Sequence, residues 1–242
     1  MCDKNLLKDP SKRNLLKYSA GAAAFTAFGS LPTLSYAASL TKEARDKMTP
    51  DQVITSLAEG NKRFISNKRM EHDYIAQKKT SQHGQYPSSV ILSCIDSRVP
   101  AEIVLDAGIG DMFNSRVAGN VSNADILGSM EFACAVAGAK VVLVLGHTKC
   151  GAVQGAIAKV KMGNLTTLLN KIEPSIAKTK FKGERKAENY DFVDAVAKTN
   201  VEMTIQEIRK NSETLAKLEK EGKIKIVGAM YNISNGKVDF FN

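Results

Sequence analysis

The sequence predicts an α/β fold with a mainly parallel central β-sheet, an antiparallel edge strand and a cover of helices. Two continuous apolar runs, Val90–Ser93 and Lys140–Leu145, are typical of parallel strands that are buried on both faces. Each run is followed by a turn and an amphipathic helix, which is the order of a strand–turn–helix unit. Near the carboxyl terminus, the turn residues Ser234–Gly236 join a strand over Ile224–Tyr231 to a last one over Val238–Phe241, so we expect an antiparallel edge there.

Helical patterns and short connections account for the other segments. Thr49, Pro50 and Asp51 form a helix start signal, and apolar residues recur at helical spacing as far as Ile65. The polar segment from Asn67 to Pro87 predicts an irregular connection that can hold a short helix. The remaining expected elements are a short helix over Ala101–Asp106, a short strand over Met112–Val117, helices from Asn123 to Ala137 and from Ala152 to Val160, and a largely helical stretch over residues 161–222.

Composition predicts one globular domain. The chain has 242 residues, of which 43% are apolar and 24% are charged. It holds no apolar run of about 18 to 20 residues, so we expect no stable membrane insertion. The net charge of +9 is typical of some nucleic-acid-binding proteins, but the basic residues are scattered and lack the aromatic or glycine context of such modules, which favours a solvated basic surface without a nucleic-acid partner. The four cysteines are too few for a disulfide scaffold.

Residues 1–37 predict an export signal, followed by one domain over residues 38–242. A basic region precedes the apolar run from Ala20 to Leu31, and small residues before a cleavage point end at Ala37. The run from Ser11 to Lys17 resembles a twin-arginine signal in which Lys12 replaces the first arginine. We therefore expect a periplasmic or secreted protein. The alternative is an attached N-terminal helix and a cytoplasmic protein.

Metal-ligating side chains follow both apolar strands. Cys94 comes directly after the first strand, and His147 and Cys150 follow the second. Because sites in open α/β sheets lie at the carboxyl ends of the strands, we expect these three side chains to meet. Thiolate and neutral imidazole are ligands that zinc prefers, and three protein ligands leave one coordination position open, as in catalytic zinc sites. Taken singly, each cysteine has a plainer interpretation as a packing residue or as part of an incidental disulfide.

Asp96 and Arg98 follow Cys94 closely enough to belong to the same site. Arg98 can hold the Asp96 carboxylate through two hydrogen bonds, or the two residues can form a simple surface ion pair. Asp96 is also the one adjacent candidate for a fourth zinc ligand. Zinc with an open position lowers the pKa of its bound water from about 15.7 to near 7, so the pattern predicts a nucleophile at neutral pH.

Two motifs resemble the signatures of the β-class carbonic anhydrases: Cys94–Arg98, and Gly146 to Ala152 with His147 and Cys150. The likeness extends from about Thr49 through Phe241. The resemblance implies one Zn²⁺ per subunit on Cys94, His147 and Cys150, with Asp96 and Arg98 as the catalytic dyad. It also implies a homodimer with sites at the subunit interface, often assembled into a tetramer.

The same resemblance implies a substrate pocket. It assigns Gln85 to hydrogen bonding with the substrate, Phe113 and Ala118 to apolar walls, and Gly151 to a backbone N–H near the zinc. Phe132 stands where many family members have tyrosine, so a pocket built here lacks that hydroxyl. The chain also has no tryptophan, which the bicarbonate-inhibited branch of the family uses, so we expect the constitutively open branch.

The expected function is therefore that of a zinc-dependent carbonate dehydratase, a lyase that converts CO2 reversibly to bicarbonate and a proton through zinc-bound hydroxide. Two alternatives keep the same metal: hydrolysis of COS or CS2, and a non-catalytic zinc- or bicarbonate-binding protein. The proton shuttle is not identified. His83, near Gln85 in the chain, is a disfavoured candidate, and Cys134 is expected to pack in the core and not to bind the metal.

Overall fold

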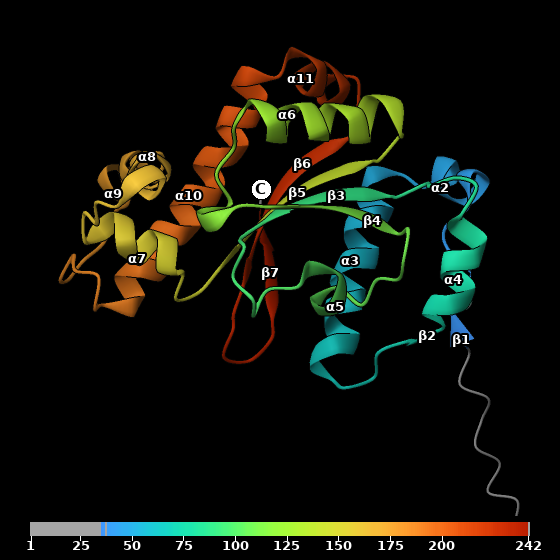
Figure 1. Cartoon of the computed structure of the whole chain (residues 1–242), viewed down its shortest axis with the longest axis horizontal. Coiled ribbons are helices and arrows are strands. Elements are labelled where there is room, and N and C mark those ends of the chain that lie inside the picture. The colour runs from blue at the N-terminus through green and yellow to red at the C-terminus, as the bar shows by residue number, and fades with distance from the viewer. Residues whose placement is uncertain (1–34, 37, 242) are drawn as a thin grey trace, which may run out of the picture. The chain divides into compact units, whose positions relative to one another are not determined.

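The computed structural model describes residues 35–36 and 38–241, and a five-stranded sheet lies at its centre (Figure 1). The strand order is β4-β3-β5-β6-β7. β3, β4, β5 and β6 are parallel, and β7 is antiparallel to β6. The bounds are Ser89–Ser93 for β3, Met112–Arg116 for β4, Val141–His147 for β5, Lys225–Tyr231 for β6 and Val238–Phe241 for β7. The predicted fold class is thereby confirmed.

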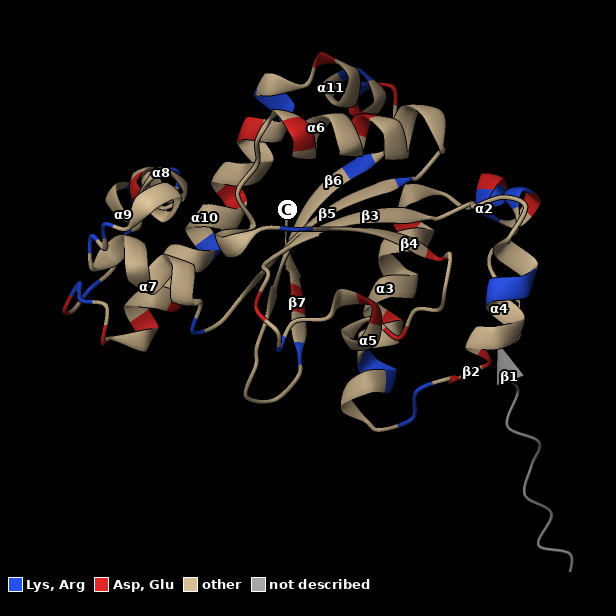
Figure 2. Cartoon of the chain, viewed as in Figure 1, with Lys and Arg blue, Asp and Glu red and all other residues tan. Residues whose placement is uncertain are grey.

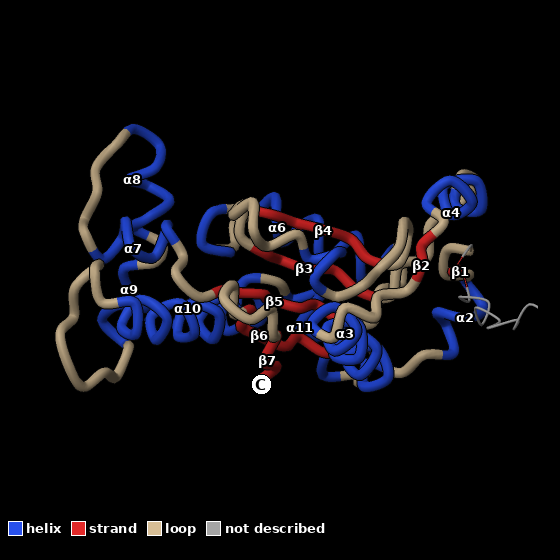
Figure 3. The backbone as a smooth tube through the Cα atoms, turned by 90° about the horizontal axis from the view of Figure 1, so that it is seen from below, coloured by secondary structure: helices blue, strands red, loops and turns tan. Residues whose placement is uncertain are grey.

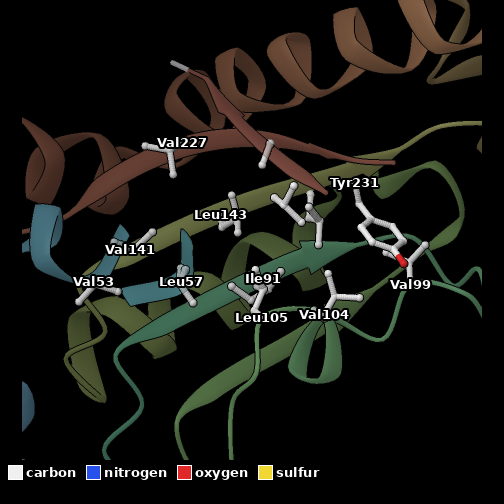
Figure 4. Packing of buried hydrophobic residues seen from close by; sticks show 14 residues of the cluster. Val53, Leu57, Ile91, Val99, Val104, Leu105, Val141, Leu143, Val227 and Tyr231 are labelled. Carbon is white, nitrogen blue, oxygen red and sulfur yellow. The ribbon is translucent and has the colours of Figure 1, made fainter. Parts of the chain in front are cut away.

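Alternate residues of the central strands fill two apolar layers, because successive strand side chains point to opposite faces. On one face, Ile91 and Leu143 pack with Val53 and Leu57 of the long helix α3, Pro50–Ile65 (Figure 4). On the other face, Leu92 and Val144 pack with residues of the helices α6 (Ala124–Glu131), α10 (Tyr190–Asn211) and α11 (Glu213–Lys220). Burial on both sides explains why β3 and β5 are continuous apolar runs in the sequence.

Helices cover both faces of the sheet and gather at both ends of its parallel strands. In Figures 1 and 3, α7, α8 and α9 lie beyond the carboxyl ends of the strands, and α2 and α4 lie beyond the amino ends. The helices are α2 (Lys42–Lys47), α3 (Pro50–Ile65), α4 (Tyr74–Ser81), α5 (Ala101–Val104), α6 (Ala124–Glu131), α7 (Gly151–Ile157), α8 (Gly163–Asn170), α9 (Glu173–Lys178), α10 (Tyr190–Asn211) and α11 (Glu213–Lys220).

Local capping explains where several helices begin. Thr49 caps α3 in a reciprocal capping box: its hydroxyl accepts from the backbone N–H of Gln52, and the Gln52 side chain accepts from the backbone N–H of Thr49. Asn123 caps α6 and Asn189 caps α10 through their side-chain oxygens. These caps coincide with the start signals that the sequence predicts for α3 and α6.

Several element bounds differ from the sequence-based expectation, and two differences concern how an element ends. The strand expected to end at Leu145 continues through His147, because Gly146 and His147 remain paired with Met230 and Tyr231 of β6. The helix that begins at Asn123 does not stay regular, since its last part, Phe132–Val136, is a π-helical turn. The first difference matters for function because it places a metal-ligand candidate on a buried strand.

The first described residues are tied to the rest of the fold. β1 (Ser35–Tyr36) pairs in parallel with β2 (Glu71–His72). The Ser39 hydroxyl lies 3.0 Å from the carbonyl oxygen of Gln77 and 2.7 Å from that of Ile109. The predicted export signal falls mostly on residues 1–34 and on Ala37, outside the described residues, so the signal and its cleavage point stay predictions.

Charged residues are distributed over many helices and loops, and basic and acidic groups lie near one another (Figure 2). Exposed pairs include Lys42 with Asp46 and Lys62 with Glu59. Such pairs each contribute little to stability. Within residues 35–36 and 38–241, no helix has both the length and the apolar content that crossing a bilayer requires.

Candidate metal centre

The structure brings Cys94, His147 and Cys150 together at the carboxyl ends of β3 and β5. Their ligand atoms all lie within 4.8 Å of one another, and all three residues are buried. β3 and β5 are adjacent parallel strands in which Ser93 pairs with Leu145, so Cys94 and His147 leave the sheet at the same edge. Cys150 is the residue before α7, three positions after His147. Parallel register and one tight turn therefore build the cluster.

His147 is oriented for coordination through one nitrogen. Its side chain is fully buried, and Nδ1 donates to the carbonyl oxygen of Thr148 at 2.9 Å. That bond assigns the proton to Nδ1 and leaves Nε2 as an acceptor. Nε2 is buried and has no hydrogen-bond partner among the described residues. A buried nitrogen of this kind is costly in the absence of a partner, so it points to a ligand at this position.

The two cysteine side chains lie close together, and each affects the pKa of the other. A hydrogen bond from the Cys150 thiol is the largest cause that lowers the pKa of Cys94 to about 4, and burial opposes this shift. The pKa of Cys150 is raised well above its usual value by its hydrogen bond with Cys94 and by burial of the side chain. Replacing the Cys150 thiol proton with a cation would let both sulfurs act as thiolates, the form that binds metal.

Asp96 lies beside this cluster and is held by Arg98. The Arg98 side chain donates from Nε to Oδ1 at 2.9 Å and from Nη2 to Oδ2 at 2.7 Å, and its backbone N–H donates to Oδ1 at 2.9 Å. The Arg98 side-chain bonds are the first cause that lowers the pKa of Asp96 to about 2. Asp96 Oδ2 lies 3.9 Å from His147 Nε2. The carboxylate is therefore fixed next to the point where the ligand atoms converge.

Arg116 is a structural part of this centre that the sequence interpretation did not assign. It ends β4 and pairs with Ser93. Its guanidinium donates to the carbonyl oxygen of Cys94 at 2.9 Å and to that of Asp96 at 2.6 Å. The parallel register of neighbouring strands was the available signal, because it places the end of β4 beside the end of β3.

The turn between His147 and Cys150 is held from outside by α10. Lys149 has a left-handed backbone conformation, with φ at 54°. Its backbone N–H donates to Asp194 Oδ1 at 2.6 Å. Burial raises the pKa of Asp194. This contact fixes the residue next to Cys150 in a conformation that non-glycine residues rarely adopt.

These residues fit a zinc ion. Two sulfurs and one imidazole nitrogen match the ligand preference of zinc, and the converging atoms include an unpartnered Nε2. Asp96 stands outside the three-residue cluster, bonded to Arg98, so its predicted role as a fourth ligand stays a prediction.

Comparisons with known proteins show which proteins this chain resembles. The carbonic anhydrase family matches residues 89–238. Carbonic anhydrase 2 of Mycobacterium tuberculosis is 34% identical over 189 residues, covering 75% of this chain and 88% of the relative. The β-carbonic anhydrase CafA of Aspergillus fumigatus superposes with a TM-score of 0.63 at 26% identity, covering 79% of this chain and 91% of the other.

The chain belongs to the β-carbonic anhydrase family. Its classification as a carbonate dehydratase, a lyase, is confirmed by this membership. The carbonic anhydrase of Mycolicibacterium smegmatis is similar as well, with 30% identity over 76% of this chain and 89% of the relative. A tetrameric β-carbonic anhydrase of Sordaria macrospora has the same fold, with a TM-score of 0.59 at 22% identity, over 78% of this chain and 97% of the other.

Two of the predicted pocket residues lie near the cluster. Ala118 is half-buried and precedes Gly119, whose backbone N–H points at the Cys94 sulfur. Gly151 is the first residue of α7, directly after Cys150, and is exposed. Apart from its chain neighbours and the backbone of its own helix, a Cβ atom on Gly151 would meet nothing within 4 Å, so open space lies on that side of the residue.

The other two predicted pocket residues lie toward the opposite ends of the strands. Gln85 is exposed in the loop that leads into the amino end of β3, whereas Cys94 follows the carboxyl end of that strand. Phe113 pairs with Val90 near the start of β3 and contacts Phe132, with 6.2 Å between ring centroids. These two rings help to line an open hollow of about 630 Å³. The single chain therefore does not bring Phe113 or Gln85 to its own cluster.

The remaining sequence assignments concern residues outside the centre. Cys134 lies on the π-helical turn Phe132–Val136, where it is buried in the apolar layer that includes Leu92 and Val144, and burial raises the pKa of its thiol to about 12. It is not part of the three-residue cluster, which agrees with a packing role. His83 is exposed, in the loop that also holds Gln85.

Proposed function

We propose that this chain is a zinc-dependent carbonic anhydrase that converts CO2 and water reversibly to bicarbonate and a proton. The observation that carries the proposal is the buried Cys94–His147–Cys150 cluster, whose His147 Nε2 has no partner among the described residues. Asp96 lies beside that nitrogen and is held there by hydrogen bonds from Arg98. Family membership supports the same activity.

Cys94, His147 and Cys150 would hold the zinc, and the fixed protein groups prepare the centre for it. Bound zinc would supply a water molecule whose pKa is lowered from about 15.7 to near 7. His147 presents Nε2 because Nδ1 is engaged with Thr148. Arg98 keeps the Asp96 carboxylate ionised and immobile, so Asp96 can accept a hydrogen bond from a reacting oxygen at the metal-facing edge of the site.

A second copy of the chain is proposed to complete the pocket. Gln85 and Phe113 lie toward the amino ends of β3 and β4, and a five-residue strand spans roughly 17 Å. The hollow lined by Phe113 and Phe132 is open to solvent in the isolated chain, and β4 is an edge strand of the five-stranded sheet. A twofold dimer through this edge would bring the partner subunit's Gln85 and Phe113 toward Cys94, whether or not two such dimers form a tetramer.

Zinc content and CO2 hydration in matched cysteine variants test the proposed function. Cys94→Ala removes one cluster ligand, whereas Cys134→Ala removes a buried cysteine outside the cluster. We expect Cys94→Ala to lose bound zinc and hydration activity, and Cys134→Ala to keep one zinc per chain and near wild-type activity. Full activity in Cys94→Ala would refute the proposed site.

Subunit complementation tests the shared pocket. Cys94→Ala and Gln85→Ala chains are each expected to have low activity when pure. If the pocket combines residues of two subunits, a mixed dimer contains one site in which both residues are intact, so activity should rise on mixing and subunit exchange. A mixture that gives only the sum of the separate activities would contradict the proposal.

We also propose that residues 1–37 direct export, on the basis of their basic and apolar sequence pattern. Fractionation of cells that express the full chain, with mass analysis of the product, tests this proposal. A product confined to the cytoplasm with residues 1–37 attached would contradict it.

Neither alternative function considered from the sequence, COS or CS2 hydrolysis or non-catalytic zinc or bicarbonate binding, is supported by the relatives described above.

A further inference from the structure

A buried amide on α10 contacts the turn that faces the zinc-ligand candidate Cys94. Asn200 is 2% exposed and lies among apolar residues of the helix, including Ala197 and Val201. A buried amide on an apolar helix face is costly unless both ends of the amide are bonded. Here Nδ2 donates to the carbonyl oxygen of Gly119 at 2.8 Å, and Oδ1 accepts from the Ser175 hydroxyl at 3.3 Å.

Gly119 connects this amide to the metal centre. Its backbone N–H donates to the Cys94 sulfur at 3.4 Å. Its N–H and its carbonyl belong to two successive peptide units, and the φ and ψ angles of Gly119 set the angle between those units. Glycine leaves these angles unusually free. Contacts on the carbonyl side of Gly119 therefore help to fix the direction of its N–H toward the sulfur.

Two contacts supply that restraint. The backbone N–H of Asn120 donates to the carbonyl oxygen of Val117 at 2.9 Å, and Asn200 holds the carbonyl oxygen of the same peptide unit. Gly119 also has a φ of +69°, and a Cβ atom there would lie 2.7 Å from Ile172 Cδ1, so no other residue fits this turn without strain. The Asn200 side chain thus restrains a turn in which only glycine fits.

We propose that Asn200 is a positioning residue for the metal centre, which acts by aiming the Gly119 N–H at the Cys94 thiolate. A hydrogen bond to a metal-bound thiolate stabilises its negative charge and fixes its direction, and partners of this outer kind tune both the affinity and the electronic properties of a metal. The inference rests on the proposed zinc-binding role of Cys94, His147 and Cys150.

Cobalt substitution gives a readout that depends on the sulfur itself. Co²⁺ bound to thiolate shows a sulfur-to-cobalt charge-transfer band, and loss of the N–H bond should raise the energy of the sulfur electrons and move this band to longer wavelength. Asn200→Leu keeps a similar side-chain size and removes the donor. Thr204→Val is the matched control, since Thr204 is another buried polar residue of α10.

We expect Asn200→Leu to shift the charge-transfer band to longer wavelength and to weaken zinc binding by about tenfold to a hundredfold. Thr204→Val should leave the band unmoved. If Asn200→Leu does not fold, the isosteric Asn200→Asp variant, which replaces the donating nitrogen with an acceptor, should give the same shift. An unmoved band in a folded Asn200 variant overturns the inference, even where affinity falls. Failure of the wild-type chain to bind Co²⁺ or Zn²⁺ would instead refute the proposed function.

Discussion

The turn residue Gly119 provides the sharpest test of the packing around the metal centre. Replacing it with alanine adds a Cβ atom 2.7 Å from Ile172 Cδ1 and 3.3 Å from Ala152 Cβ. Ile172 is fully buried, so its side chain has little room to move. Gly222, which follows α11, has the same φ of +69°, but a Cβ atom there would meet no atom within 4 Å. Comparing alanine variants at the two positions therefore separates the cost of the left-handed backbone conformation from the cost of crowding.

The expected costs follow from these two terms. An alanine in the left-handed conformation costs about 1 to 2 kcal/mol. Overpacking a buried site adds typically about 1 to 3 kcal/mol. Gly222→Ala should therefore lower the free energy of unfolding by about 1 to 2 kcal/mol, and Gly119→Ala by about 2 to 5 kcal/mol.

Urea unfolding of the metal-free proteins, followed by far-ultraviolet circular dichroism, measures both costs. Metal-free protein is required because bound zinc would add stability that depends on its concentration. The midpoint should fall further for Gly119→Ala than for Gly222→Ala at an unchanged slope. Equal losses in the two variants, or a smaller loss for Gly119→Ala, would refute the crowding that the structure assigns to this turn.

Three further predictions concern other parts of the chain. Arg98→Leu removes both side-chain hydrogen bonds to Asp96, so the rate constant for CO2 hydration should fall by up to about a hundredfold at unchanged zinc content. Arg98→Lys should lose less, and an unaltered rate in Arg98→Leu would argue against the Asp96–Arg98 dyad. Burial raises the pKa of Cys134 to about 12, so this thiol stays protonated in the folded chain, whereas an unfolded chain loses the proton above about pH 9. The free energy of unfolding, measured with urea, should therefore decline between about pH 9 and 12 more steeply in the wild type than in Cys134→Ala. Parallel pH profiles in the two proteins would contradict this prediction. Asn61 donates to the carbonyl oxygens of Val104 and Gly236 and accepts from the backbone N–H of Val238. Asn61→Leu should therefore lower the free energy of unfolding by about 2 to 4 kcal/mol. A loss below about 0.5 kcal/mol would show that these bonds contribute little.

Much of the sheet could be predicted from the sequence, because its strands carry local signals. β3 and β5 are buried on both faces and are therefore continuous apolar runs. α3 begins at a capping box that is visible as Thr49 followed by Gln52. The end of β5 was missed because pairing with β6, which is more than 70 residues away in the sequence, carries the strand through His147.

The centre itself was only partly predictable, for a similar physical reason. Cys94, His147 and Cys150 stand at strand ends, so the rule that sites form at the carboxyl edge brings them together. Asn200 and Gly119 carry no such local signal, since their contact joins residues 81 positions apart. The positions of Gln85 and Phe113 at the far ends of the strands also depend on three-dimensional register, which a motif does not contain.

Titration of the metal-free chain with zinc, with the initial rate of CO2 hydration recorded by stopped flow at each step, tests the central claim most directly. If Cys94, His147 and Cys150 form one catalytic zinc site, the rate should rise in proportion to bound zinc and stop rising at one ion per chain. A rate that stays at the uncatalysed value when one zinc is bound per chain would contradict the account.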